Sequence, residues 1–307
     1  MTPRLDAPQE IIGFRRSTAT PGIEIVDALH SPREWRVVCP SYAVVVFRTW
    51  GGPVHFAGRT YRGEPGAVFC GVPNELMVSR PEGNRPGSFN VLEFAPEVLR
   101  EWLAEQRGPT ARPEWLASMQ PISAPLSAKF RHFFDGFEAE GSPLRLQSEL
   151  LGISEAIVHG LIALGGGRAS NFDGPPIRGT ARMRECLHEE GFDIDLETLA
   201  RRVGMNRFQA LRAFKRRYGL PPHAYQLAVR LGLARRMLSE GAAPVEVAMH
   251  CGFVDQSHFT RHFKRAFGVT PLQCARGQRL SSAGYLARRA VRSDPDSVVS
   301  RSDRHGG

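Results

Sequence analysis

Hydrophobic residues follow two different spacings along this chain. Between residues 35 and 94, short runs rich in Val, Phe, Tyr and Trp are separated by turn residues, as in SYAVVVFRTW followed by GG. Strands at this spacing predict an antiparallel β-sandwich or barrel. Further along, apolar residues recur every three or four positions, which is typical of amphipathic helices. The pattern therefore predicts a β-rich front domain and a helical back domain.

Three helices are predicted to follow the strands, over residues 96–106, 126–140 and 143–164. In the last of these, Ser142 is a suitable N-cap and Pro143 suits the first helical position. Its apolar stripe suits packing either on the sandwich or on a partner chain, and the sequence leaves both alternatives open. The stripe consists of Leu146, Leu150, Ile153, Ile157 and Leu161.

Two segments lack apolar periodicity. The stretch GGGRASNFDGPP, residues 165–176, is full of turn formers and indicates a linker between domains. From about residue 281 onward the chain is mostly Ser, Arg and Asp with few hydrophobic residues, which predicts a disordered tail.

The stretch GFVDQSHFTRHFKRAFGVTP, residues 252–271, predicts a helix with two unlike faces. Phe259, Phe263 and Phe267 lie four residues apart and form a core stripe. The opposite face carries hydrogen-bond donors without one carboxylate, whereas a solvated face normally mixes charges of both signs. These donors are Ser257, His258, Arg261, His262, Lys264 and Arg265.

This helix has a second copy earlier in the chain. FKRRYGLPP, which begins at Phe214, and FKRAFGVTP, which begins at Phe263, place an aromatic residue, lysine, arginine, glycine and proline in register. Upstream lies a second match, LARRVG at 199–204 and VAMHCG at 247–252. Each unit thus predicts a short apolar helix, a glycine turn and a longer basic helix. This is the layout of a helix-turn-helix.

Positive charge gathers in the same region. Residues 177–280 hold 18 Lys and Arg against 9 Asp and Glu, whereas residues 1–176 hold 17 against 19. The net charge of +9 therefore comes almost wholly from the back domain. Such a distribution is expected of a nucleic-acid-binding module joined to a neutral domain.

Residues 178–277 resemble the DNA-binding domain of the AraC/XylS family of bacterial transcription regulators. The matching stretches are LARRVGMNRFQALRAFKRRYGLPPHAYQ, RLGLARRMLSEG and PVEVAMHCGFVDQSHFTRHFKRAFGVTP. The resemblance implies two helix-turn-helix units joined by a long helix, and activation of transcription more often than repression. The joining helix is predicted over residues 223–238, with Gly232 as its one weak point.

The helical wheel and the resemblance together predict which side chains meet DNA. An arginine at the centre of each recognition face suits bidentate hydrogen bonds to guanine, and the Lys and Arg further along suit phosphates. The expected base contacts are Phe208, Gln209, Leu211, Arg212, Ser257, His258 and Arg261. The expected phosphate contacts are Lys215, Arg216, Gln256, Lys264 and Arg265.

Two positions depart from the family pattern. Leu211 stands where a polar residue is often found, which weakens the expectation of base reading by the first recognition helix. Ala243 stands where a capping Ser or Asp is common before Pro244, so a weaker helix start is predicted there.

The front domain resembles, more weakly, the cupin-like effector-binding domain of the same family, in its strand spacing and in PGAVFCGVP. Metal-dependent cupins need two or three His and a Glu, but His55 is the lone histidine among the strands between residues 35 and 94. No metal and no other cofactor is therefore predicted. An effector site inside the sandwich is predicted instead, with Trp50, His55, Tyr61 and Phe69 as its lining.

Several classes of protein are disfavoured. The five cysteines form no CxxC pair and fit neither a disulfide framework nor a zinc site. Neither a signal pattern nor a run of about 18 apolar residues is present, which predicts a cytoplasmic protein without membrane contact. No nucleophile with an adjacent base is recognised, so no catalytic residue is predicted.

These observations predict a two-domain α+β protein, in which a cupin-like antiparallel β-sandwich or barrel with flanking helices precedes an all-α domain with two helix-turn-helix units. Double-stranded DNA, RNA polymerase, a small-molecule effector and a second copy of the chain are the predicted partners. A regulator without an effector, and a cupin-type enzyme tethered by a basic domain, remain alternatives. The predicted segments are a sensing domain (1–110), a helical dimerisation segment (111–164), the linker (165–177), the DNA-binding domain (178–280) and the tail (281–307).

Overall fold

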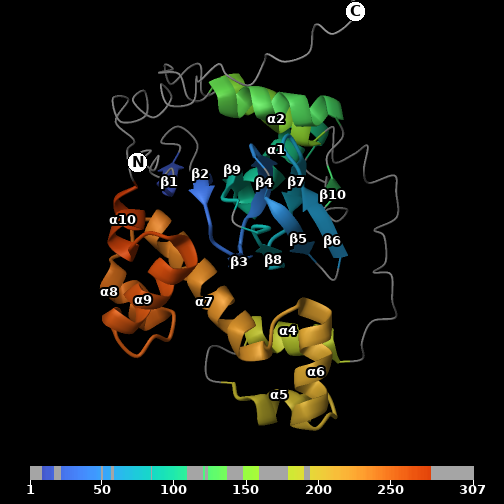
Figure 1. The fold of residues 1–307 in the computed structure, drawn as a ribbon, viewed down its shortest axis with the longest axis vertical. Helices are drawn as coiled ribbons and strands as arrows, with labels where there is room; N and C mark the ends of the chain where they lie inside the picture. Colours follow the sequence, from blue (N-terminus) through green and yellow to red (C-terminus); the bar gives the residue numbers. More distant parts are fainter. Residues whose placement is uncertain are drawn as a thin grey trace, which may run out of the picture.

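A computed structural model describes residues 9–16, 22–49, 51–56, 59–83, 85–108, 120–121, 124–136, 148–158, 179–189 and 194–277. Within these ranges the chain forms a β domain followed by a helical domain, as the hydrophobic pattern predicts (Figure 1). The predicted linker and tail lie outside the described residues, so both remain predictions.

Two antiparallel sheets make up the β domain and enclose a common core. The first has the strand order β1-β2-β9-β4-β7-β10, and the second has the order β3-β8-β5-β6. The strands of the first sheet are β1 (Ile11–Arg16), β2 (Ile23–Ser31), β9 (Gly87–Phe94), β4 (Tyr42–Phe47), β7 (Val68–Gly71) and β10 (Gln120–Pro121). The strands of the second are β3 (Trp35–Val38), β8 (Leu76–Ser79), β5 (Gly52–Phe56) and β6 (Arg59–Gly63).

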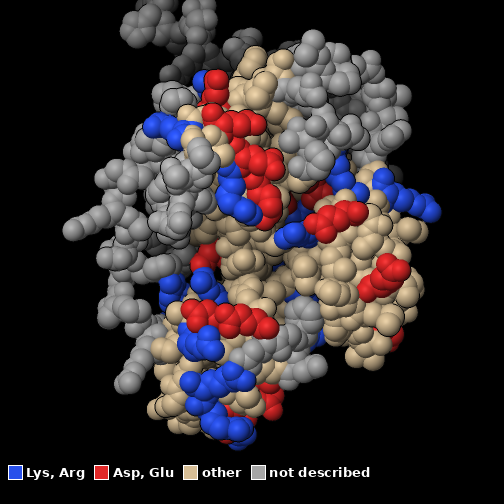
Figure 2. All heavy atoms as spheres, turned by 180° about the vertical axis from the view of Figure 1, so that it is seen from behind, with Lys and Arg blue, Asp and Glu red and all other residues tan. Residues whose placement is uncertain are grey.

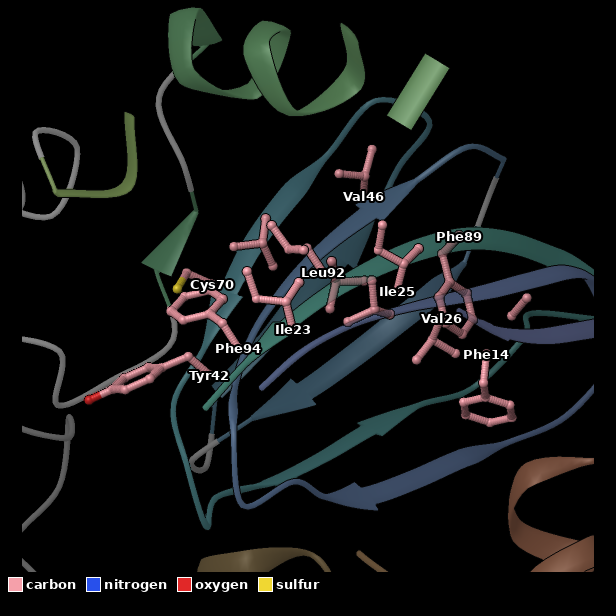
Figure 3. Close-up of a cluster of buried hydrophobic side chains, with 14 of the residues drawn as sticks. Phe14, Ile23, Ile25, Val26, Tyr42, Val46, Cys70, Phe89, Leu92 and Phe94 are labelled. Atoms are coloured by element: carbon pink, nitrogen blue, oxygen red, sulfur yellow. The ribbon is translucent and has the colours of Figure 1, made fainter. Parts of the chain in front are cut away.

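The first sheet is buried on both faces, because helices cover its outer side. In Figure 3 Tyr42 and Phe94 lie against each other, and their ring centroids are 5.5 Å apart. Helix α1 (Pro96–Arg107) buries Val98, Leu99, Trp102 and Leu103 against the sheet, and the ring centroids of Trp102 and Phe94 are 5.3 Å apart. Helix α2 (Ala124–Gly136) lies over the same side of the sheet (Figure 1).

The third predicted helix is described over residues 148–158, which are helical. Leu150, Ile153 and Ile157 from its apolar stripe are buried in the core that includes the sheets. Leu146 and Leu161 lie outside the described residues. The described part of the stripe therefore packs within the chain rather than facing a partner.

The helical domain has two lobes joined by one long helix. The first lobe holds α4 (Thr180–Glu189), α5 (Leu196–Arg202) and α6 (Arg207–Tyr218). The second holds α8 (Pro244–His250), α9 (Gln256–Phe267) and α10 (Pro271–Arg276). Helix α7 (Pro222–Ser239) runs between the lobes beneath the β domain (Figure 1). It covers the predicted joining segment and extends it by one residue at each end.

The repeat produces the same local geometry twice. Gly204 and Gly252 follow the leading helices α5 and α8 with φ angles of 65° and 69°, a conformation that glycine adopts without steric cost. Phe214 and Phe263 are fully buried in the cores of the two lobes. The predicted glycine turns and core stripes are thus both present.

A buried ion cluster connects α7 to the β domain. The guanidinium of Arg235 is 3% exposed and forms ion pairs with Glu24 on β2 and Glu93 on β9. Nearby, Gly232 packs so closely on β3 that an added Cβ would overlap the carbonyl oxygen of Val38. The β domain and the helical domain are therefore closely packed against each other.

Candidate nucleic-acid interface

The first predicted recognition helix, α6, presents a basic outer face. Asn206 caps it by accepting a hydrogen bond from the backbone of Gln209, whose side chain accepts one from Asn206 in return. This capping box occupies the amide oxygen of Gln209 and leaves its NH₂ group to face outward. Phe208 is 60% exposed, and Arg212 is exposed one turn further along.

Leu211 does not share this exposure. It is half-buried in a crevice formed by α5 and the start of α7, with Leu199 and Pro222 among its neighbours. This position explains why an apolar residue is accommodated where a polar one is common. Leu211 stays a predicted base contact, but its burial limits how far it can reach.

The second predicted recognition helix, α9, has the same construction. Asp255 caps its first turn through the backbone N–H of His258, and Phe259, Phe263 and Phe267 are buried beneath it. Ser257 and Arg261 are exposed. The predicted donor face thus points away from the core of the lobe.

His258 is less available than the pattern suggests. Its ring is half-buried against Phe253 at 5.8 Å and against His262 at 4.5 Å. Burial, followed by the charges of His258 and the neighbouring arginines, lowers the pKa of His262 below its usual value. The imidazole of His262 therefore favours its neutral form, which can both donate and accept hydrogen bonds.

All five predicted phosphate contacts are exposed on the outer sides of α6 and α9. Along α9 they border a groove of about 630 Å³, to which Arg33 of the β domain also contributes. Glu10 holds the guanidinium of Arg33 at 2.7 Å, and Arg33 donates to the carbonyl oxygen of Arg265 at 3.4 Å. The groove lining contains no carboxylate and consists of Arg33, Gln256, Ser257, Thr260, Arg261, Lys264 and Arg265.

Acidic and basic side chains are distributed unevenly around the first lobe. Helix α6 has no Asp or Glu, whereas α4 carries Glu185 and Glu189 beside Arg182. Figure 2 shows a face of this lobe on which red and blue side chains mix, as is usual for a solvated surface. Among the helices α4, α5 and α6 of this lobe, α6 alone therefore lacks acidic residues.

The predicted effector residues do not meet in one place. Tyr61 and Phe69 lie in the interior with ring centroids 5.7 Å apart, but His55 is exposed on β5 and bonds to Thr60 at 2.8 Å. Trp50 lies outside the described residues. A cavity between the two sheets has a different lining, described below, so this effector set stays a prediction without support from shared geometry.

His, Cys, Asp and Glu side chains are dispersed in the described part of the chain. No group of three or more His, Cys, Asp or Glu is close enough there to hold a metal ion. All five cysteines are free and buried, and burial raises the pKa of the Cys70 thiol to about 12. No helix among the described residues has the length and hydropathy to cross a bilayer.

Comparison with known proteins agrees with this geometry. Residues 199–277 match the family model of a helix-turn-helix domain. The chain is 35% identical over 113 residues to the transcriptional regulator GbdR of Pseudomonas aeruginosa, covering 36% of this chain and 30% of GbdR. It is 36% identical over 90 residues to the virulence regulon transcriptional activator VirF of Yersinia enterocolitica, covering 29% and 33%. The matched part spans about a third of these relatives.

Among solved structures, apo ToxT from Vibrio cholerae aligns over 83% of this chain and 96% of its own, with a TM-score of 0.47 and 11% identity. That similarity is below the level at which a common fold follows. The family match covers residues 199–277, a range that includes the two glycine turns at Gly204 and Gly252. The C-terminal part of this chain therefore contains a helix-turn-helix domain that is similar to those of known transcriptional regulators.

Proposed function

We propose that this chain is a sequence-specific DNA-binding transcription regulator in which both helix pairs, α5–α6 and α8–α9, act as helix-turn-helix units. One observation carries the proposal: α6 and α9 present exposed, arginine-bearing faces without a carboxylate, and they do so in two copies of one repeat. Such faces suit the acidic, donor-and-acceptor surface of a DNA major groove. The similarity to the transcriptional regulator GbdR and the transcriptional activator VirF supports the same function.

In this proposal Arg212 and Arg261 read bases, and the exposed Lys and Arg nearer the helix ends hold phosphates. Helix α7, with 18 residues, is about 27 Å long at about 1.5 Å per residue. Successive major grooves on one face of B-DNA lie about 34 Å apart. Two lobes on such a rod therefore suit adjacent grooves, with some bending of the DNA.

The β domain is proposed to sense a small-molecule effector. Its two antiparallel sheets are compatible with a cupin-like domain, and it packs directly on α7, which sets the positions of both lobes. An effector that favours one packing over another would shift which DNA sites are reached. A second copy of the chain and RNA polymerase complete the proposed set of partners.

Selection from a randomised pool of duplex DNA with the full chain tests this function. We expect enrichment of two unlike boxes about one helical turn apart, because the outer faces of α6 and α9 differ. Inserting about five base pairs between the boxes should abolish simultaneous contact, since one box then faces the opposite side. Absence of any enriched sequence would overturn the function.

The spacing also tests the role of α7. Inserting about ten base pairs restores the face but adds a full turn of length, which a rigid helix cannot span. Protection of only one box is therefore expected in footprinting. Full protection of both boxes at this spacing would mean that α7 does not hold the lobes rigidly.

A further inference from the structure

A cavity of about 60 Å³ lies between the two sheets of the β domain. Its walls are mostly apolar, with aromatic side chains from both sheets, among them Trp35, Phe56 and Phe89. Figure 3 shows three lining residues, Phe14, Val26 and Phe89, together within the buried cluster. Two further lining residues, Arg235 and Phe267, come from α7 and α9 of the helical domain.

One part of the lining is acidic. Glu93 lines the cavity, and it stands directly opposite Glu24 in the pairing of β2 with β9. Both carboxylates are buried, and like charges at directly opposed positions of a sheet repel each other. Burial and the charge of Glu93 raise the pKa of Glu24 above its usual value, although Arg235 opposes this shift. Within the β domain, Arg16 of β1 pairs with Glu24 at 3.4 Å, which leaves Glu93 in need of a cation.

The structure supplies that cation from the other domain. Arg235 pairs with both carboxylates, and the thiol of Cys39 donates to Glu93 at 3.2 Å. The guanidinium also lies 5.8 Å from the ring centre of Phe14 and 5.9 Å from that of Phe267, within the range of cation–π attraction. The acidic and aromatic groups at this end of the cavity thus already bind an organic cation, the side chain of Arg235.

The size of the cavity limits what can enter beside Arg235. An apolar cavity needs roughly 150 Å³ to hold a benzene ring, more than twice the present space. A ring-bearing ligand therefore requires Arg235 or Phe267 to withdraw. Withdrawal of Arg235 leaves two buried carboxylates without their main partner, which is costly unless the ligand replaces the charge.

We propose that this cavity binds a small organic cation, an apolar body bearing an amidinium, guanidinium or ammonium group, which replaces Arg235 at Glu24 and Glu93. Binding then releases α7 from the β domain and frees the two lobes to change their relation to it. The proposal gives the chemical class of the effector. Only the effect of the ligand on DNA binding rests on the proposed function. A carboxylate ligand is disfavoured because it would face Glu24 and Glu93 in the same space.

Benzamidine is a suitable probe, with benzamide and benzoate as neutral and anionic controls of the same shape. Tryptophan fluorescence of the full chain reports binding because Trp35 lines the cavity, and Trp35→Phe identifies its share of the signal. We expect a saturable response to benzamidine, and binding of both controls weaker by at least about ten-fold. Saturable binding of benzoate that is lost in Arg235→Gln would overturn the proposal.

Two variants should move the affinity in opposite directions. Glu93→Gln should weaken benzamidine binding about ten-fold or more, because it removes a carboxylate that receives the ligand. Arg235→Gln should strengthen it, because the internal competitor is gone. Arg236→Gln is the matched control, since Arg236 is exposed and pairs with Glu240 on the outer side of α7. Circular dichroism establishes that each variant is folded, and Glu24→Gln and Arg235→Lys replace any variant that is not.

The outcomes separate the inference from the function on which it rests. A folded chain that selects DNA but gives no saturable response to benzamidine, phenylguanidine or cyclohexylamine at millimolar concentration refutes the cation site alone. A chain that binds benzamidine in the expected order of variants but enriches no DNA sequence refutes the regulator function alone. Unchanged affinity in both Glu93→Gln and Arg235→Gln would also refute the site, because neither group would then contact the ligand.

Discussion

The two lobes of the helical domain come from the same sequence repeat but meet the β domain in different ways. The second lobe shares a continuous core with the sheets, and Arg16 of β1 donates to the carbonyl oxygens of Cys274 and Ala275 at 2.8 and 3.2 Å. The first lobe has a core of its own, joined by only three residues of the β domain: Val38, Leu76 and Val78.

Polar contacts at the edge complete the attachment of the first lobe. Arg184 of α4 forms an ion pair with Glu75, and the hydroxyl of Tyr225 donates to the carbonyl oxygen of Asn74 at 3.2 Å. The repeat therefore determines how each lobe folds, whereas residues outside it determine how each lobe is attached. A change in the β domain reaches the second lobe through a shared core and the first lobe mainly through α7.

Removal of the Arg235 side chain should cause the largest loss of stability, because Arg235 pairs α7 with the β domain. Arg235→Ala leaves Glu93 buried without its cation and leaves Glu24 with Arg16 alone, and breaking such a buried pair typically costs about 3–5 kcal/mol. Arg236→Ala, one residue along, removes an exposed pair with Glu240 and should cost only about 0.3–0.5 kcal/mol. Urea unfolding of both variants gives the comparison. Equal losses would show that the buried cluster does not hold the domains together.

Two glycine substitutions test whether α7 packs closely on the β domain. Gly232→Ala places a methyl group against the backbone of Val38, which cannot move aside as a side chain does, and should cost about 1–3 kcal/mol. Gly152→Ala, on a helical residue with no atom within 4 Å of the added carbon, should instead stabilise by about 0.5–1 kcal/mol. Thermal unfolding reports both signs. A stabilising Gly232→Ala would mean that α7 does not pack closely on β3.

Local patterns in the sequence predicted much of this structure. The span of α1 and its buried residues, the glycine turns and the long α7 all follow from periodicity and repeat. Gly232, however, reads in the sequence only as a weak helix former, and its close approach to Val38 is visible only in the folded chain. Its role depends on which surface α7 meets.

The ion cluster and the cavity could not be predicted in this way. Glu24, Glu93 and Arg235 lie far apart in the chain, and each taken alone resembles an ordinary surface charge. Aromatic residues among strands identify a core but not which of them surround a space. This is why Tyr61 and Phe69 were expected at the effector site although they do not line the cavity.

Substitution of the two arginines that are proposed to read bases should distinguish the lobes in DNA binding. Arg212→Ala and Arg261→Ala should each cost about 1–3 kcal/mol on the selected site and relax the sequence preference of one box only. Lys264→Ala should weaken binding to selected and random DNA by similar factors, because phosphates carry no sequence information. Competition binding on both DNAs decides the matter. Equal losses on random DNA for the arginine variants would contradict base reading.

The smallest expected effect concerns the leading helices, α5 and α8. Asp195 caps α5 by accepting from the backbone N–H of Thr198 at 2.7 Å, whereas Ala243 at the start of α8 makes no side-chain cap, as the sequence predicts. Ala243→Ser adds a hydroxyl acceptor three residues before Glu246, which completes a capping box and should stabilise the chain by about 1 kcal/mol.

The matched change in the first lobe is Asp195→Ala, which should destabilise because it removes the cap that α5 has. The backbone hydrogen bond to Thr198 lowers the pKa of Asp195. The cap therefore contributes its full stabilisation at pH values above the ordinary carboxyl pKa, and this stabilisation is lost as the pH falls through the lowered pKa of Asp195. The serine hydroxyl of Ala243→Ser does not ionise in this pH range, so its gain should depend on pH only through Glu246 of the capping box. Urea unfolding at neutral and acidic pH measures both changes. A neutral effect of Ala243→Ser would mean that packing against α7 and α9, rather than its first turn, limits the stability of α8.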